Sequence, residues 1–426
     1  VVVALFAATA GADTCISPTK TYTVHVDLFA GELGRFSLFF FSFRLGPALT
    51  TVSIGYYTFE ECPGMINPDI GMEIGEVYTF PQTDRSNYFH PMGFAYFADG
   101  AHADLDELEP CIAPHGTSSD CAATCTCPAP MYLIDGRYPG TYSNIPEILP
   151  ISTGEDNFGL DDYEPLFFHP LPDWAGYGDF EIKLRFDVAD FTSDIFYFCH
   201  IHELMSGRIK LLRDGSPVQA NPVPALPYSY DEPGPFDREC GTFGLDAFQL
   251  PHPECLSEFV CDVPRDDPEL RVFSDCIDAM DCHMMVGMTT GKASASSTAL
   301  FVHQMIPHHQ NAVNMAKALL KRGDLSCPDL TSEDDDCVME QILREIVNAQ
   351  NYQIQQMQGV LESLGIPPED DCEVIVNPQP SAKDKKRKGD KKKMKDKMKK
   401  DKMERSKKGR KGEKKGGGGR KLLRIM

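Results

Sequence analysis

Residues 196–210 read FYFCHIHELMSGRIK, and this stretch decides the fold expected for the first half of the chain. Its aromatic start favours a β-strand ending at Cys199, which a tight polar loop would join to a second strand. Cys199, His202 and Met205 stand at the spacing Cys-x2-His-x2-Met. A thiolate, an imidazole and a weakly bound thioether on one loop suit a mononuclear copper ion held for electron transfer.

Such a site needs two imidazoles beside the thiolate, with a distant methionine that tunes the potential. His90 precedes a proline and leads into residues 94–97, FAYF, three of which are aromatic, so it is expected to stand beside a strand far from the loop. Alternatively, Cys199 is a disulfide partner and His202 a surface residue. His200 would point the other way along the strand, toward the surface or the surroundings of the site.

Residues 199–209, CHIHELMSGRI, resemble the short ligand loop of some cupredoxins, and residues 90–94, HPMGF, resemble the first-histidine strand of that superfamily and of multicopper oxidases. The resemblance covers about residues 19–214 and implies a Greek-key β-sandwich. It also implies that His90, Cys199, His202 and Met205 bind type 1 copper. Oxygen-reducing chemistry would need several His-x-His pairs, and the chain has only residues 200–202, so laccase activity is not supported.

Helical periodicity begins near Val272, and three helices are expected. The first carries several methionines around His283. The second, near residues 297–321, has Pro307 inside it and should kink there. The third would begin with a capping motif at Ser332 and end before Gly365. Its expected apolar stripe contains Met339, Leu343, Ile346, Gln350, Gln353, Met357, Leu361 and Leu364.

Residues 301–316, FVHQMIPHHQNAVNMA, resemble the signature of the family called domain of unknown function 305, and QIQQM at 353–357 resembles its closing helix. That family forms ferritin-like four-helix bundles, and some members are periplasmic copper-binding resistance proteins. The resemblance spans about residues 272–366 and implies a second metal-binding set: His303, Met305, His308, His309, Met315, Met284, Met285, Met288 and Met357. The alternative is that the methionines only fill a core. The Glu-x-x-His pairs of di-iron bundles are absent.

The net charge of −22 combines two unlike parts. Residues 381–426 hold 23 of the 41 basic and 6 of the 63 acidic residues, so this tail carries +17 and the remainder −39. With no aromatic residue, the tail is expected to be disordered. It could bind an anionic polysaccharide or another polyanion through charge alone, without specific nucleic-acid recognition, or lie loosely against the acidic remainder.

The first residues and the cysteines indicate the cellular compartment in which the protein folds. Residues 1–12, VVVALFAATAGA, look like the remnant of a signal peptide. Fifteen cysteines favour an oxidising compartment, and if Cys199 is a metal ligand the other fourteen could pair. Cys327 and Cys337 are expected to pair, and disulfides rather than zinc are expected at Cys111, Cys121, Cys125 and Cys127. No apolar run is long enough to span a membrane.

These observations predict a multidomain β-plus-α protein. Its parts are a signal remnant (1–12), a cupredoxin-like domain (13–213), a Cys- and Pro-rich connector (214–270), a four-helix-type His/Met-rich domain (271–366) and a linker with the basic tail (367–426). The expected function is one-electron transfer at a type 1 copper, coupled to copper homeostasis by the helices, in a secreted or lumenal protein. A redox partner or copper donor would be its partner. The alternatives are an oxidase of Cu(I) or a small reductant, and a matrix-associated structural protein anchored by its tail.

Overall fold

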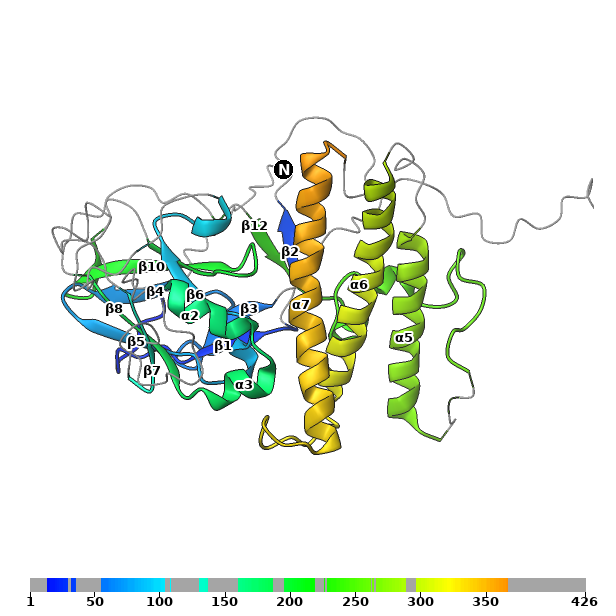
Figure 1. Cartoon of the computed structure of the whole chain (residues 1–426), viewed down its shortest axis with the longest axis horizontal. Helices are drawn as coiled ribbons and strands as arrows, with labels where there is room; N and C mark the ends of the chain where they lie inside the picture. Colours follow the sequence, from blue (N-terminus) through cyan, green and yellow to red (C-terminus); the bar gives the residue numbers. More distant parts are fainter. Residues whose placement is uncertain are drawn as a thin grey trace, which may run out of the picture. The chain divides into compact units, whose positions relative to one another are not determined.

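A computed structural model describes residues 14–29, 32–35, 55–103, 108, 130–136, 160–186, 195–218, 226, 228–261, 263, 266–288 and 296–366. β-Strands occupy the N-terminal half and long helices the C-terminal half (Figure 1), which confirms the predicted order of β then α. The predicted signal remnant, the four cysteines between 111 and 127 and the basic tail lie outside the described residues.

The strands form two main sheets and two small pairs. One sheet has the order β11-β10-β9-β6, with β4 parallel to β10; its strands are β4 (Ile70–Glu73), β6 (Met92–Ala95), β9 (Ile195–Cys199), β10 (Ser206–Arg213) and β11 (Ser216–Pro217). The other has the order β5-β8-β7, from β5 (Val77–Pro81), β7 (Met131–Ile134) and β8 (Phe180–Arg185). β1 (Val24–Asp27) pairs with β3 (Tyr56–Phe59), and β2 (Glu32–Arg35) with β12 (Tyr228–Asp231). Short helical turns between the strands are η1 (Arg85–Asn87), η2 (Gly100–Ala103), α2 (Leu160–Tyr163), η3 (Glu164–Phe168) and α3 (Leu171–Gly176).

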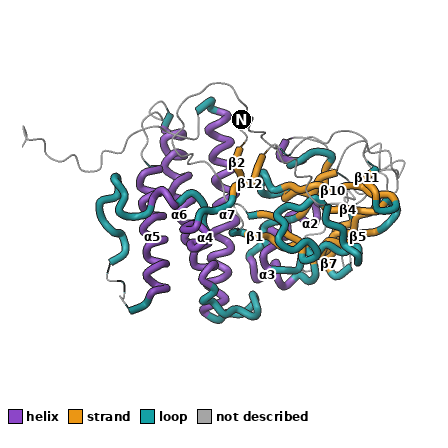
Figure 2. The backbone as a smooth tube through the Cα atoms, turned by 180° about the vertical axis from the view of Figure 1, so that it is seen from behind, coloured by secondary structure: helices purple, strands orange, loops and turns teal. Residues whose placement is uncertain are grey.

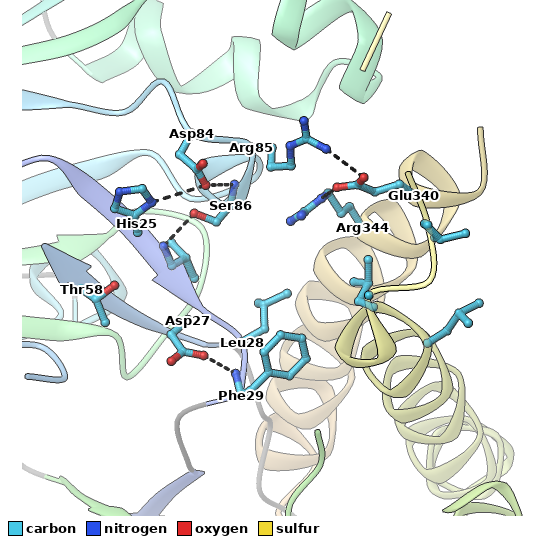
Figure 3. Close-up of a pocket in the computed structure, with 15 residues that line it drawn as sticks. His25, Asp27, Leu28, Phe29, Thr58, Asp84, Arg85, Ser86, Glu340 and Arg344 are labelled. Carbon is cyan, nitrogen blue, oxygen red and sulfur yellow. Dashed lines mark hydrogen bonds and ion pairs between the residues drawn. The ribbon is translucent and has the colours of Figure 1, made fainter. Parts of the chain in front are cut away.

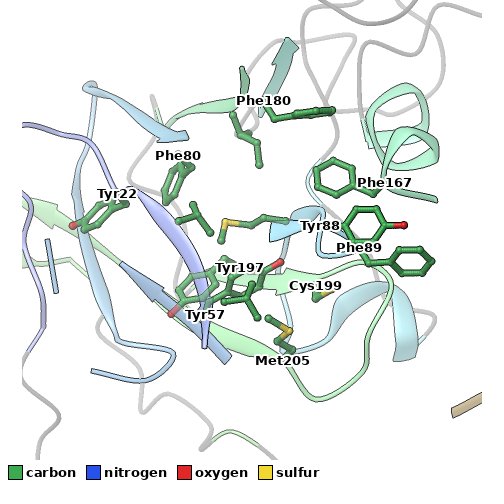
Figure 4. Close-up of a cluster of buried hydrophobic side chains, with 14 of the residues drawn as sticks. Tyr22, Tyr57, Phe80, Tyr88, Phe89, Phe167, Phe180, Tyr197, Cys199 and Met205 are labelled. Atoms are coloured by element: carbon green, nitrogen blue, oxygen red, sulfur yellow. The ribbon is translucent and has the colours of Figure 1, made fainter. Parts of the chain in front are cut away.

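A core of aromatic side chains fills the β region (Figure 4). β8 alternates buried and more exposed residues, as its sequence predicts, whereas every residue of β9 and β6 is buried. The Tyr197 ring meets Phe59 edge-on at 5.4 Å between centroids. Gly207 lies opposite Tyr197 in the β9–β10 ladder, and a Cβ there would come within 2.0 Å of the tyrosine oxygen. Glycine at this position therefore leaves room for the Tyr197 ring between the two strands that flank the Cys199 loop.

The described helical part contains three long helices, α5 (Pro268–Gly287), α6 (Ser297–Arg322) and α7 (Asp335–Ser363). α6 lies between the other two in both views (Figures 1 and 2). α5 begins earlier than its apolar periodicity indicates, because Asp267 caps it by accepting from the Leu270 amide. The cap predicted at Ser332 is wrong. α7 begins at Asp335, and the Ser332 hydroxyl instead accepts from the Asp334 amide in the preceding turn.

The connector contains α4 (Pro235–Cys240) and η4 (Asp246–Phe248) and is braced by disulfides, as predicted. Cys240–Cys276 and Cys255–Cys282 join it to α5, and the predicted Cys327–Cys337 bond closes the α6–α7 loop. A fourth disulfide, Cys15–Cys62, lies in the β region. Four disulfides in the described part of the chain indicate an oxidising, extracellular or lumenal environment.

Two cysteines of the described residues are unpaired, the buried Cys199 and the exposed Cys261. The alternative prediction that Cys199 forms a disulfide is therefore wrong. Of the helices described, none combines the length and the apolar character of a membrane span.

Replacing Cys240 and Cys276 together by serine should lower the free energy of unfolding of the helical part by about 2–4 kcal/mol, because a constraint between residues 36 positions apart is lost from the unfolded chain. Denaturant unfolding followed by circular dichroism at the helix signal measures this. Cys261→Ser, at an exposed unpaired thiol, is the control and should have no effect. Equal stability of the double variant and the wild type would contradict the prediction.

Candidate metal centre

His90, Cys199 and His202 converge at the end of two paired strands, and all three are fully buried. The Nδ1 atoms of His90 and His202 each lie 3.7 Å from the Cys199 sulfur. Antiparallel pairing of β6 with β9 sets Met92 opposite Cys199, so His90, two residues before Met92, reaches the sulfur from 109 positions away. The ring centroids of the two histidines are 4.6 Å apart.

The backbone around His90 is held at three points. Its amide donates to the Asn87 carbonyl at 2.8 Å, and its carbonyl accepts from the Gln82 side chain at 2.8 Å and the Tyr57 hydroxyl at 3.1 Å. The preceding residue, Phe89, adopts a left-handed φ of 67° that a bulky side chain seldom takes. A backbone held in such a conformation by its surroundings is common at functional sites.

The loop from Cys199 to Met205 closes on itself. The Cys199 amide donates to the Met205 carbonyl at 3.1 Å, and the His202 amide donates to the Cys199 sulfur at 3.3 Å. Asp99 accepts from the Met205 amide at 3.2 Å and from the Ser206 hydroxyl at 2.8 Å, which ties the end of the loop to a distant turn. Met205 is buried in the same cluster as Cys199 (Figure 4). The predicted loop therefore holds its donor-bearing residues in a closed, buried turn.

Burial sets the protonation of these groups. It raises the pKa of the Cys199 thiol to about 12, although the amides of His202 and Ile201 oppose the shift. It lowers the pKa of His202 to about 4 and that of His90 well below its usual value, in the latter case with the help of the neighbouring His202. At neutral pH the cluster is thus a neutral thiol facing two neutral imidazoles, which can accept a metal ion once the thiol proton leaves.

Helix α7 covers the cluster, through a residue that the sequence did not single out. Asn348 contacts both imidazoles, with its side-chain oxygen 3.0 Å from His90 Nε2 and its backbone oxygen 3.2 Å from His202 Nε2. The predicted stripe of α7 is partly wrong: Leu343 and Leu361 are buried, but the predicted Met339, Gln353 and Leu364 are exposed. The buried face instead includes polar residues, namely Glu340, Asn348 and Asn351. An apolar periodicity cannot reveal them, although their spacing with Leu343 and Val347 follows one helical face.

Two further histidines, His102 and His200, lie beside the cluster, and each contacts an atom other than the Cys199 sulfur. His102 Nε2 lies 2.9 Å from the carbonyl oxygen of Cys199. His200 Nδ1 lies 2.6 Å from a Glu164 carboxylate oxygen. Its imidazole therefore contacts a residue beside the site, which agrees with the predicted position at the surface or in the surroundings of the site. Both histidines line a cavity of about 320 Å³ whose lining also includes Tyr352 of α7.

A larger cavity, of about 530 Å³, lies between β1, η1 and the α6–α7 end, and none of the four predicted ligands lines it (Figure 3). Across it, Arg85 pairs with Glu340 of α7 at 2.9 Å. On its β side Asp84 raises the pKa of His25, and His25 in turn holds the pKa of Asp84 well below its usual value. The Arg85–Glu340 ion pair holds α7 against the β region on one side of this cavity.

The second predicted set does not form one cluster. Met285, Met315 and Met357 pack into three different apolar clusters, and the Met284 sulfur accepts from the Asn311 side chain at 3.3 Å. His303 is buried; Met288, Met305 and His309 are half-buried; His308 is exposed, its ring 5.9 Å from that of His309. In the described helical half, one group of three His, Cys, Asp or Glu side chains has its ligand atoms close enough together to hold a metal ion. This group is His252, Cys255 and Cys282, and its two sulfurs are joined as a disulfide.

Comparison with known families bears on the helical half. Residues 298–414, which are 117 of the 426, match the family described as Domain of unknown function (DUF305). The match includes α6 and α7 and extends beyond the described residues, but it begins after α5, later than the predicted start near residue 272. Searches of curated proteins and of solved structures found no match. The predicted resemblance of the helices is thus confirmed in part, while that of the β region to cupredoxins stays a prediction.

Binding of a divalent ion at this cluster should release one proton, at pH 6 as at pH 7.5, because the Cys199 thiol is protonated and both imidazoles are already neutral over this range. Proton release in weakly buffered solution, followed during metal addition, measures it. Cys261→Ser should behave as the wild type and Cys199→Ser should release none. A release that grows by a proton or more at pH 6 would contradict the neutrality of the imidazoles.

Proposed function

We propose that this chain is a copper protein that carries single electrons at a site formed by His90, Cys199, His202 and Met205. The observation that supports it most is the approach of two Nδ1 atoms to one buried, unpaired cysteine sulfur. Two imidazoles and a thiolate with a weak methionine are the donor set that blue copper centres use. Copper bound by these side chains would supply one-electron redox chemistry.

The chemistry of the donors favours copper over the other common ions. Structural zinc is held by four Cys or His ligands, and only three converge here among the described residues. Hard cations such as Ca²⁺ and Mg²⁺ select oxygen ligands. The cysteine and the two histidines, by contrast, are soft or borderline donors, to which the thioether of Met205 would add a fourth.

Burial favours electron transfer over substrate turnover. The four side chains have no measurable exposure, since β6, β9 and the loop surround them and α7 lies over the imidazoles. A small reductant would have no open position at which to bind, which disfavours the alternative of a Cu(I) or small-reductant oxidase. A closed, rigid set of ligands also limits rearrangement between the two oxidation states.

The copper-loaded, oxidised protein should show an intense absorption band in the red that arises from the thiolate–copper bond. Cys199→Ser should abolish the band, because oxygen cannot replace the thiolate. Cys261→Ser is the matched control at the other unpaired cysteine and should leave it unchanged. A wild-type protein that binds no copper, or binds it without this band, would refute the proposal.

Copper handling by the helices is a second proposal, resting on His308 and His309. Their rings are 5.9 Å apart, and His308 is exposed, so this pair is open to an ion from solution. Burial and the charge of His308 lower the pKa of His309, which keeps that imidazole available as a neutral ligand. Imidazole nitrogens are among the donors that copper accepts.

If so, the wild type should bind more than one Cu(I) per chain, and His308→Ala with His309→Ala should remove the additional ion while retaining the first. His252→Ala, a histidine of the connector stacked on Phe248, is the control and should not change the count. Metal analysis after dialysis gives the stoichiometry. A single ion in the wild type would exclude this second function.

The proposal has three further parts. The protein would be secreted or lumenal, it would exchange electrons or copper with a redox partner protein or a copper donor, and its basic tail would bind a polyanion. The disulfides support the first of these. The electron partner would have to approach a site whose histidines are covered by α7.

A further inference from the structure

We infer that Asn348 of α7 is a positioning residue that holds both imidazoles of the metal centre in the form whose Nδ1 is free to bind metal. The inference rests on the proposed metal site and names a part of it that comes from the helical half of the chain. Asn348 is 4 % exposed and reaches His90 through its side chain and His202 through its backbone.

The orientation of the Asn348 amide is fixed by a third contact. Its nitrogen donates to the Tyr88 carbonyl at 3.1 Å, and a carbonyl oxygen can only accept. The side-chain oxygen must therefore be the atom that faces His90 Nε2 at 3.0 Å. Tyr88 is two residues before His90, so the Asn348 side-chain amide forms hydrogen bonds with both ends of this short segment.

The oxygen of Asn348 in turn determines which histidine nitrogen carries the proton. An amide oxygen has no proton to give, so His90 Nε2 must be the donor in this bond. A neutral imidazole has a single ring proton, which leaves Nδ1 of His90 bare and directed at the Cys199 sulfur 3.7 Å away. The same reasoning applies to His202, whose Nε2 donates to the backbone oxygen of residue 348 and whose Nδ1 also lies 3.7 Å from the sulfur.

Anchoring of α7 makes this contact stable. Two turns before Asn348, Glu340 pairs with Arg85 at 2.9 Å and is itself bonded to Arg344 at 2.8 Å. Arg85 begins the turn η1 that leads to Tyr88 and His90. A partner that fixes the tautomer and ring orientation of a histidine ligand commonly strengthens metal binding, and its loss costs about 10–100-fold in affinity.

Asn348→Leu separates the two contacts, because it removes the side-chain oxygen that serves His90 and keeps the backbone oxygen that serves His202. Nitrogen NMR of the imidazoles in the metal-free, full-length protein at pH 7 reports each tautomer, and competition with a Cu(I) chelator reports affinity. The wild type should show both histidines protonated at Nε2. In Asn348→Leu, His90 should become a mixture of tautomers while His202 stays unchanged, and Cu(I) affinity should fall about 10–100-fold.

Val347→Ala is the control, since it weakens the packing of the same helix at a fully buried neighbour without removing a bond to either imidazole. It should leave both tautomers and the affinity near the wild-type values. The inference is overturned if wild-type His90 is protonated at Nδ1, a result that needs no variant to fold. It is also overturned if Asn348→Leu keeps the wild-type tautomer, or if Val347→Ala loses as much affinity. Absence of Cu(I) binding by the wild type would refute the proposed function instead, while the tautomers would still decide the role of Asn348.

Discussion

The pairing of β6 with β9 is the constraint on which the candidate site depends. It puts Met92 opposite Cys199 and thereby carries His90 to the sulfur across more than a hundred residues of chain. The ladder is secured by an aromatic core in which both strands are buried at every position, and Gly207 leaves room for the Tyr197 ring beside the ligand loop. A shift of this register by one residue would turn Cys199 away from His90 and so remove one imidazole from the candidate site.

The helical half is as much a part of this site as the strands. Arg85 and Glu340 form a charge-assisted pair between η1 and α7, and Asn348 on the same helix meets the two imidazoles. Burying such polar groups costs free energy unless their hydrogen bonds are satisfied, so these contacts also specify where α7 can lie. The region that matches the DUF305 family therefore forms one wall of the candidate centre, whose possible donors come from the β region.

The sequence predicted what is local. The Cys199–Met205 loop could be found because its donors lie within seven residues between two strand-like segments, and His90 because a proline and an aromatic strand follow it. The three long helices followed from their apolar periodicity, and the Cys327–Cys337 bond from two cysteines that bracket a short loop.

Contacts between distant segments could not be predicted in this way. Asn348 escaped because hydrophobic periodicity gives no weight to a buried amide whose partners, Tyr88 and His90, are about 260 residues away. The predicted start of α7 was wrong because Ser332 looks like a helix cap in the sequence. In the structure its hydroxyl accepts from the Asp334 amide in the turn before the helix. The methionines of the second set share a sequence pattern, yet Met285, Met315 and Met357 lie in separate clusters because α5, α6 and α7 present different faces to one another.

The most direct test of the central claim is X-ray absorption at the copper edge on full-length protein loaded with one equivalent of copper. The account predicts a short bond to one thiolate sulfur together with two imidazole nitrogens. A first shell of nitrogen and oxygen alone, with no thiolate sulfur, would contradict it.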